Sequence, residues 1–160
     1  MDVASFTIDH DKLLKGLYVS RKDYLTGGAC VTTFDVRMKL ANGEPPLDVP
    51  AIHTLEHLMA VYLRSADSGI ADDVIYVGPM GCRTGMYLIL KGERTSEEIL
   101  PFVAGTYRFM MNFKGEIPAT TSKECGNYLE HNLFLAKWEA KQFYETTLSC
   151  MKPENMAYPV

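Results

Sequence analysis

The sequence lacks the features that would place it in a membrane or on a nucleic acid. It has no apolar run near the roughly 18 residues that a transmembrane helix requires. Its first residues show no basic segment followed by an apolar one, the pattern of a secretion signal. The net charge is −4, and Lys and Arg are scattered, so no basic surface is expected. We therefore expect a cytoplasmic protein that has neither membrane nor nucleic acid as a partner.

Cysteine is also scarce, with four among 160 residues. A cytosolic chain of this length does not need disulfides for stability, and its cysteines more often serve metal binding or catalysis. Cys30 and Cys150 have unremarkable neighbours and are expected to be structural thiols. Cys82 and Cys125 lie in turn-like segments and are the better functional candidates. No repeat or linker interrupts the sequence, so residues 1–160 are expected to form one domain.

The pattern of apolar residues indicates both strands and helices. Residues 33–40 alternate strictly between apolar and polar side chains, which predicts a half-buried strand. Two short apolar runs, 74–77 and 86–90, flank a glycine-rich reversal and indicate an antiparallel hairpin. Helices are expected at about residues 50–64, 95–111 and 129–148, and residues 117–119 are expected to be extended. The prediction is an α+β fold in which helices pack on an antiparallel sheet as a single layered domain.

The most informative segment is residues 53–57, which read HTLEH. On a helix, His53 and His57 share one face because residues four apart are surface neighbours. Two neutral imidazoles at this spacing can bind one divalent cation, and Glu56 stands close enough to move protons beside it. The alternative is a helix that carries two solvated histidines.

Two cysteines extend this hypothesis. Cys125 is predicted just before the last helix, where the helix dipole would favour a thiolate, and with His53 and His57 it would leave one metal position open. Cys82 lies in the glycine-rich reversal next to Arg83, whose charge would favour its thiolate. A metal flanked by a thiol and a carboxylate suits carbonyl chemistry, because the metal polarises oxygen while the side chains move protons. Alternatively, Cys125 is an inert core residue and Cys82 only fills a tight turn.

The order and spacing of these motifs resemble those of the S-ribosylhomocysteine lyase, or LuxS, family. The similarity extends from about Ala4 to His131 and is carried by residues 5–10, 34–37, 53–57, 79–85 and 124–127. It departs from the family pattern at Tyr76, where an acidic residue is usual, and at Gly78, where a serine is usual. Residues 38–42 also differ from the usual sequence.

The resemblance implies a function and a set of site residues. The reaction would cleave S-ribosylhomocysteine to homocysteine and 4,5-dihydroxypentane-2,3-dione, the precursor of autoinducer-2, by two carbonyl migrations and a β-elimination. One Fe²⁺ per subunit, replaceable by Zn²⁺ or Co²⁺, would be held by His53, His57 and Cys125. Glu56 and Cys82 would be the general acid/base pair. The substrate pocket would be lined by Ser5, His10 and Arg37.

The resemblance further implies a homodimer, in which the N-terminal segment of one subunit reaches the site of the other. We then expect His10 to complete a pocket whose metal and Cys82 belong to the partner.

Two other functions fit parts of the sequence. The HxxEH pattern also occurs in inverzincin metallopeptidases, in which a downstream carboxylate such as Glu130 would be the third ligand. A metal-binding or regulatory module without activity is the non-enzymatic alternative. The presence of both Glu56 and Cys82 favours an enzyme, because neither is needed for metal binding alone.

Overall fold

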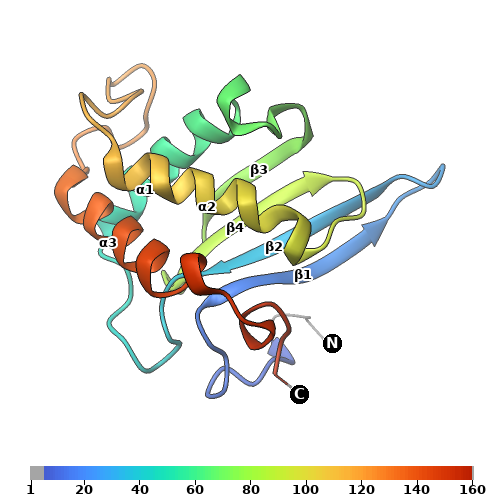
Figure 1. Cartoon of the computed structure of the whole chain (residues 1–160). Coiled ribbons are helices and arrows are strands. Elements are labelled where there is room, and N and C mark those ends of the chain that lie inside the picture. Colours follow the sequence, from blue (N-terminus) through green and yellow to red (C-terminus); the bar gives the residue numbers. More distant parts are fainter. Residues whose placement is uncertain (1–5, 160) are drawn as a thin grey trace.

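A computed structural model describes residues 6–159 and confirms the α+β prediction (Figure 1). Three helices lie on one face of a four-stranded antiparallel sheet whose strand order is β1-β2-β4-β3. The strands are β1 Gly16–Tyr24, β2 Cys30–Arg37, β3 Val74–Pro79 and β4 Gly85–Lys91. The helices are α1 Val49–Leu63, α2 Ser96–Asn112 and α3 Leu133–Thr146, with short 3-10 turns η2 Ala66–Ser68, η3 Ala71–Asp73, η4 Leu148–Cys150 and η5 Pro153–Asn155. Within the described part of the chain, none of the helices is both long and apolar enough to cross a membrane.

The core lies between the sheet and the helices. Alternate residues of β2 and β4 point into it, among them Phe34, Val36, Met86 and Leu88, all of which are fully buried. Helix α1 buries one apolar stripe, which includes Ile52, Leu55, Met59 and Leu63. Because this stripe fixes the rotation of α1, the histidines between its members lie at the edge of the core, partly buried.

The opposite face of the sheet carries polar and aromatic side chains. Asp35 and Arg37 alternate with the core residues of β2 and point to this face. The strand register places Tyr18 and Tyr87 beside Asp35, one on each neighbouring strand. This face therefore presents a row of polar groups that the helices do not cover.

Three expected boundaries were wrong. The strand predicted to reach residue 40 ends at Arg37, because the next two backbone N–H groups donate to the carbonyl of Thr84 instead of continuing the ladder. The last helix begins at Leu133 rather than near 129, where the Asn132 side chain accepts a hydrogen bond from the Leu135 N–H as its N-cap. Pro118 and Ala119 form a turn in which Ala119 has a φ of 58°, so the segment 117–119 is not extended as a whole.

Candidate metal centre and thiol pocket

Four potential metal ligands converge where α1 meets the segment 113–132. Ligand atoms of His53, His57, Cys125 and His131 all lie within 4.8 Å of one another. The shortest described contact among them joins Cys125 Sγ to His53 Nε2, at 3.4 Å. The structure thus brings together the three residues that the sequence predicted and adds a fourth.

Backbone carbonyls orient the two helical histidines. Nδ1 of His53 donates to the carbonyl of Glu130 at 2.9 Å, and Nδ1 of His57 donates to that of Pro118 at 2.8 Å. A carbonyl oxygen can only accept, so Nδ1 carries a proton in both rings, and in the neutral ring the Nε2 lone pair is left for a metal. Neutral imidazoles fixed in this way through their second nitrogen are typical of metal ligands.

His131 is the member of this group that the sequence did not predict. Its ring stacks on His53 with centroids 4.1 Å apart, and its Nδ1 lies 3.1 Å from Thr54 Oγ1. The Thr54 hydroxyl donates its one proton to the carbonyl of Pro50 at 2.9 Å, so the Nδ1–H of His131 must donate to Thr54. The lone pair of His131 is therefore on Nε2, which is buried and has no hydrogen-bond partner within residues 6–159.

The surroundings of His131 also favour its neutral form. Burial, followed by the neighbouring imidazoles of His53 and His57, holds the pKa of His131 below its ordinary value. A neutral imidazole is the form that binds a metal. The only signal for His131 in the sequence is its position shortly after Cys125, since no periodicity marks a loop histidine.

Cys125 is held by a loop and not by a helix N-terminus. Helix α3 begins only at Leu133, so the expected effect of its dipole on Cys125 was wrong. The Cys125 N–H instead donates to the carbonyl of Thr121 at 3.0 Å, and Sγ accepts from the Asn127 N–H at 3.4 Å. A tight loop therefore turns the sulfur toward the histidines.

A cavity of about 370 Å³ opens beside this cluster. Glu56, His57 and Cys125 contribute to its wall together with the turn at Pro118. The carboxylate of Glu56 therefore borders the same space as the candidate metal ligands, as its position on α1 predicts.

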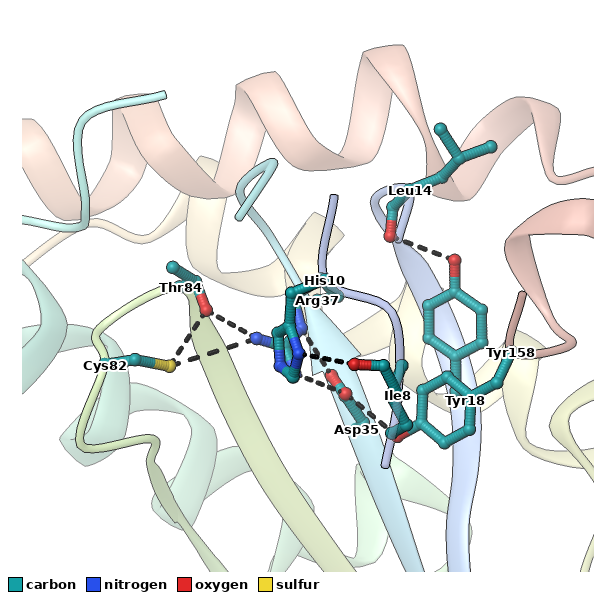
Figure 2. A network of polar contacts seen from close by, with 9 residues as sticks. All are labelled: Ile8, His10, Leu14, Tyr18, Asp35, Arg37, Cys82, Thr84 and Tyr158. Carbon is teal, nitrogen blue, oxygen red and sulfur yellow. Dashed lines mark hydrogen bonds and ion pairs between the residues drawn. The ribbon is translucent and has the colours of Figure 1, made fainter. Parts of the chain in front are cut away.

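A second cluster surrounds Cys82 on the uncovered side of the sheet (Figure 2). Arg37 forms an ion pair with Asp35 (Nη2–Oδ2 2.6 Å, Nε–Oδ1 3.1 Å), and both side chains are almost fully buried. Its Nη1 donates to Thr84 Oγ1 at 2.6 Å and lies 3.9 Å from Cys82 Sγ. Thr84 Oγ1 accepts the hydrogen bond from Arg37 with a lone pair. Its own hydroxyl proton can therefore be donated to the Cys82 sulfur, which lies 3.1 Å away.

These contacts favour the thiolate of Cys82. Burial raises the pKa of this thiol, but hydrogen bonds from the side chain and backbone of Thr84 and the charge of Arg37 lower it, so that the net pKa lies below the ordinary value. The cation beside the Cys82 sulfur is Arg37, whereas the sequence position favoured Arg83. Arg83 has a left-handed φ of 57° and donates to the carbonyl of Leu47.

The Cys82 pocket contains a further predicted residue. His10 lines it together with Arg37 and Cys82 of the same chain, in a cavity of about 290 Å³. This arrangement does not support the expectation that His10 and Cys82 belong to the sites of different chains. Ser5 lies outside the described residues.

The predicted residues thus fall into separate cavities. Glu56 borders the cavity at the metal cluster, whereas Cys82, His10 and Arg37 line two adjoining cavities, and neither of these has a lining residue in common with the first. The metallopeptidase alternative receives no support, because Glu130 is not part of the ligand group and its carboxylate accepts a hydrogen bond from Asn127.

The two unusual residues of β3 are adjacent in space. A Cβ atom on Gly78 would lie 2.0 Å from the hydroxyl oxygen of Tyr76 and 2.5 Å from its Cζ. Tyr76 therefore occupies the space that a serine at position 78 would need. Tyr76 and position 78 are therefore sterically coupled in this chain.

Taken together, the fold and the two clusters define a candidate mononuclear metalloenzyme with an activated thiol. A family model described as S-Ribosylhomocysteinase (LuxS) matches residues 3–154. A protein of Phocaeicola vulgatus named S-ribosylhomocysteine lyase is 50% identical over 157 residues, 98% of this chain and 96% of that protein. Proteins of the same name from Porphyromonas gingivalis strain W83 and Clostridium beijerinckii are 48% and 46% identical, each alignment covering 98% of both chains. The chain belongs to the S-ribosylhomocysteinase (LuxS) family.

Proposed function

We propose that this protein is a metal-dependent lyase that cleaves S-ribosylhomocysteine to homocysteine and 4,5-dihydroxypentane-2,3-dione. The observation that carries the proposal is the convergence of His53, His57 and Cys125 beside Glu56, in a chain whose relatives bear the name of this activity. The dione is the precursor of autoinducer-2, so the enzyme would serve quorum sensing and return homocysteine to the methyl cycle. We place it in the cytoplasm and treat residues 1–160 as one catalytic domain.

The donor set fits a transition metal of intermediate softness. Two imidazole nitrogens and a thiolate suit Fe²⁺, Zn²⁺ or Co²⁺ and disfavour Mg²⁺ or Ca²⁺, and we propose one Fe²⁺ per subunit as the native ion. Such an ion would supply a Lewis acid for the oxygen atoms of the sugar. His131 is available as a fourth donor or as a group that orients whatever occupies the open position.

The reaction requires proton carriers at carbon. Each carbonyl migration removes a proton from one carbon and returns one to its neighbour, and the final β-elimination breaks the C–S bond and expels the homocysteine thiolate. Hydrogen is only redistributed, so no external oxidant is needed. We assign these transfers to Glu56 and to Cys82, whose thiolate is favoured by Thr84 and Arg37. Arg37 and His10, with Ser5, are the proposed substrate-binding residues.

We further propose that the active site is shared across a homodimer. One sugar must reach both proton carriers, yet Glu56 and Cys82 border different cavities of this chain. A two-fold interface that sets the Cys82 cavity of one subunit against the metal cavity of the other would join them, and it would create two such sites at once.

The activity is tested by incubating the Fe²⁺-loaded protein with S-ribosylhomocysteine in the absence of oxygen. Homocysteine is measured by chromatography, and the dione is trapped with an aromatic diamine. We expect both products in equal amounts from the original protein. Glu56→Gln is the control, because it should keep the metal and lose most of the turnover. An absence of homocysteine from metal-loaded, folded protein would refute the proposal and favour a non-enzymatic metal-binding module.

A further inference from the structure

Residues 151–159 pack across the start of β1. Nδ2 of Asn155 donates to the carbonyl of Lys15 at 2.8 Å. A Cβ atom on Gly16 would lie 2.0 Å from the Asn155 carbonyl oxygen, so only glycine permits this close approach. The Tyr18 hydroxyl donates to the carbonyl of Leu14 at 2.9 Å and lies 3.4 Å from that of Glu154. These contacts direct the C-terminal segment, residues 151–159, toward the thiol pocket.

Tyr158, near the end of this segment, forms part of the wall of the pocket that contains Cys82 (Figure 2). Its ring stacks on Tyr18, with centroids 4.8 Å apart and planes 12° from parallel. Its hydroxyl donates to Asp35 Oδ2 at 3.0 Å. Burial and then the negative charge of Asp35 raise the pKa of Tyr158 above its ordinary value, so the hydroxyl remains a donor in the neutral pH range.

Asp35 connects Tyr158 to the reactive thiol. Its carboxylate accepts hydrogen bonds from Tyr158 and from two nitrogens of Arg37. This arrangement fixes the plane of the guanidinium, whose remaining nitrogen, Nη1, faces Thr84 and Cys82. Three donors on one carboxylate also spread its negative charge, which would otherwise oppose a thiolate nearby.

We propose that Tyr158 is a positioning residue: through Asp35 it holds Arg37 against Cys82 and thereby keeps the thiol reactive. It lies beyond residues 3–154, the part of the chain that the family model matches. The proposal rests on the proposed function only in giving Cys82 a role in proton transfer, because the reactivity of the thiol can be measured without substrate.

The test measures the alkylation rate of Cys82 by iodoacetamide from pH 6 to 10, with peptide mass spectrometry to separate Cys82 from the other cysteines. The charged and titratable groups that line the cavities around this thiol are His10, Asp35, Arg37, Glu44, Tyr87 and Tyr158. Tyr158→Phe keeps the stacked ring and removes one donor. We expect slower alkylation at neutral pH, a profile displaced to higher pH, and an unchanged rate at the alkaline limit.

Tyr18→Phe is the matched control, since it also removes a hydroxyl from the stacked pair. Within residues 6–159 the described hydrogen bonds of the Tyr18 hydroxyl go to backbone carbonyls. We expect its alkylation profile to match that of the original protein. A chain ending at Ala157 removes Tyr158 altogether and should reproduce the Tyr158→Phe profile, which covers the case in which the Phe variant does not fold.

An unchanged profile for Tyr158→Phe would overturn the proposal. So would an equal displacement for Tyr18→Phe, because the effect would then come from packing of the segment. Neither result depends on cleavage of S-ribosylhomocysteine, so failure here is distinct from failure of the proposed function.

Discussion

Arg37 and Cys82 are 45 residues apart in the sequence, yet Nη1 of the arginine lies 3.9 Å from the sulfur of the cysteine. The pairing of β2 with β4 creates this contact, since Arg37 is directly opposite Gly85 in the ladder. A Cβ atom at position 85 would lie 2.1 Å from the carbonyl oxygen of Val36, so glycine allows the strands to approach. The chemistry of Cys82 therefore depends on a long-range strand register.

The first prediction concerns the hydroxyl of Thr84. Because hydrogen bonds from Thr84 lower the pKa of Cys82, Thr84→Val should raise it. The thiolate is the reactive form, so alkylation of Cys82 should slow severalfold at neutral pH and converge with the original rate above the pKa. Thr84→Ser keeps the hydroxyl and should behave like the original protein. Equal rates for the Val and Ser variants would show that the hydroxyl does not act on the thiol.

The second prediction identifies the sulfur ligand. Cobalt-loaded protein should show a thiolate-to-metal charge-transfer band, because Cys125 Sγ lies among the imidazole nitrogens. Cys125→Ala should abolish this band, whereas Cys82→Ala, which removes a thiol from the other cavity, should retain it. Survival of the band in Cys125→Ala would exclude this residue as a ligand.

The third prediction concerns His131, whose Nε2 lone pair faces the candidate ligands. His131 either binds the ion directly or orients the groups around the ion. In both cases His131→Ala should weaken Co²⁺ binding by about 10- to 100-fold. The measurement is competition with a chromophoric chelator. His10→Ala is the matched control, because His10 lines the thiol pocket and should leave the affinity unchanged. An unchanged affinity for His131→Ala would make this residue a structural neighbour only.

Local sequence patterns predicted the part of the site that a single helix carries. His53, Glu56 and His57 are placed by the helical period of α1, and the buried stripe fixes which way they face. Strand β1 was not predicted because its register shifts between Val19 and Arg21, which breaks the alternation that marks a strand.

The remainder of the site depends on tertiary contacts. His131 and Cys125 lie in a loop, and their orientation is set by hydrogen bonds that have no periodic signal. Tyr158 reaches Asp35 only because the C-terminal segment packs over Gly16. Contacts of this kind join distant segments, so no local pattern could indicate them.

The fourth prediction tests the coupling between Tyr76 and Gly78. Gly78→Ser alone must displace the Tyr76 ring, whereas in a Tyr76→Ala background the serine has room. The free energy of unfolding should therefore show a coupling of about 0.5–3 kcal/mol in a double-mutant cycle, the range found for residues in contact. Chemical denaturation of the four proteins measures it. Additive effects would mean that the two positions changed independently.

The last prediction concerns the division of the active site between subunits. Glu56→Gln and Cys82→Ala should each keep their metal and lose about 10²–10⁴-fold in turnover, as expected for general acid–base groups. When subunits are exchanged, a heterodimer of the two variants holds one site with both lesions and one intact site. With equal amounts of each chain, roughly a quarter of all sites should be intact.

The control mixture combines His10→Ala with Cys82→Ala, two residues that line the same cavity of one chain. Every site then keeps one lesion, and no activity should return. The most direct measurement is therefore homocysteine release by the two mixtures, with heterodimers confirmed by mass. The shared-site account predicts recovery to about a quarter of the original activity for Glu56→Gln with Cys82→Ala and none for the control mixture. If the first mixture stays inactive although heterodimers form, both proton carriers belong to the site of a single chain and the account is wrong.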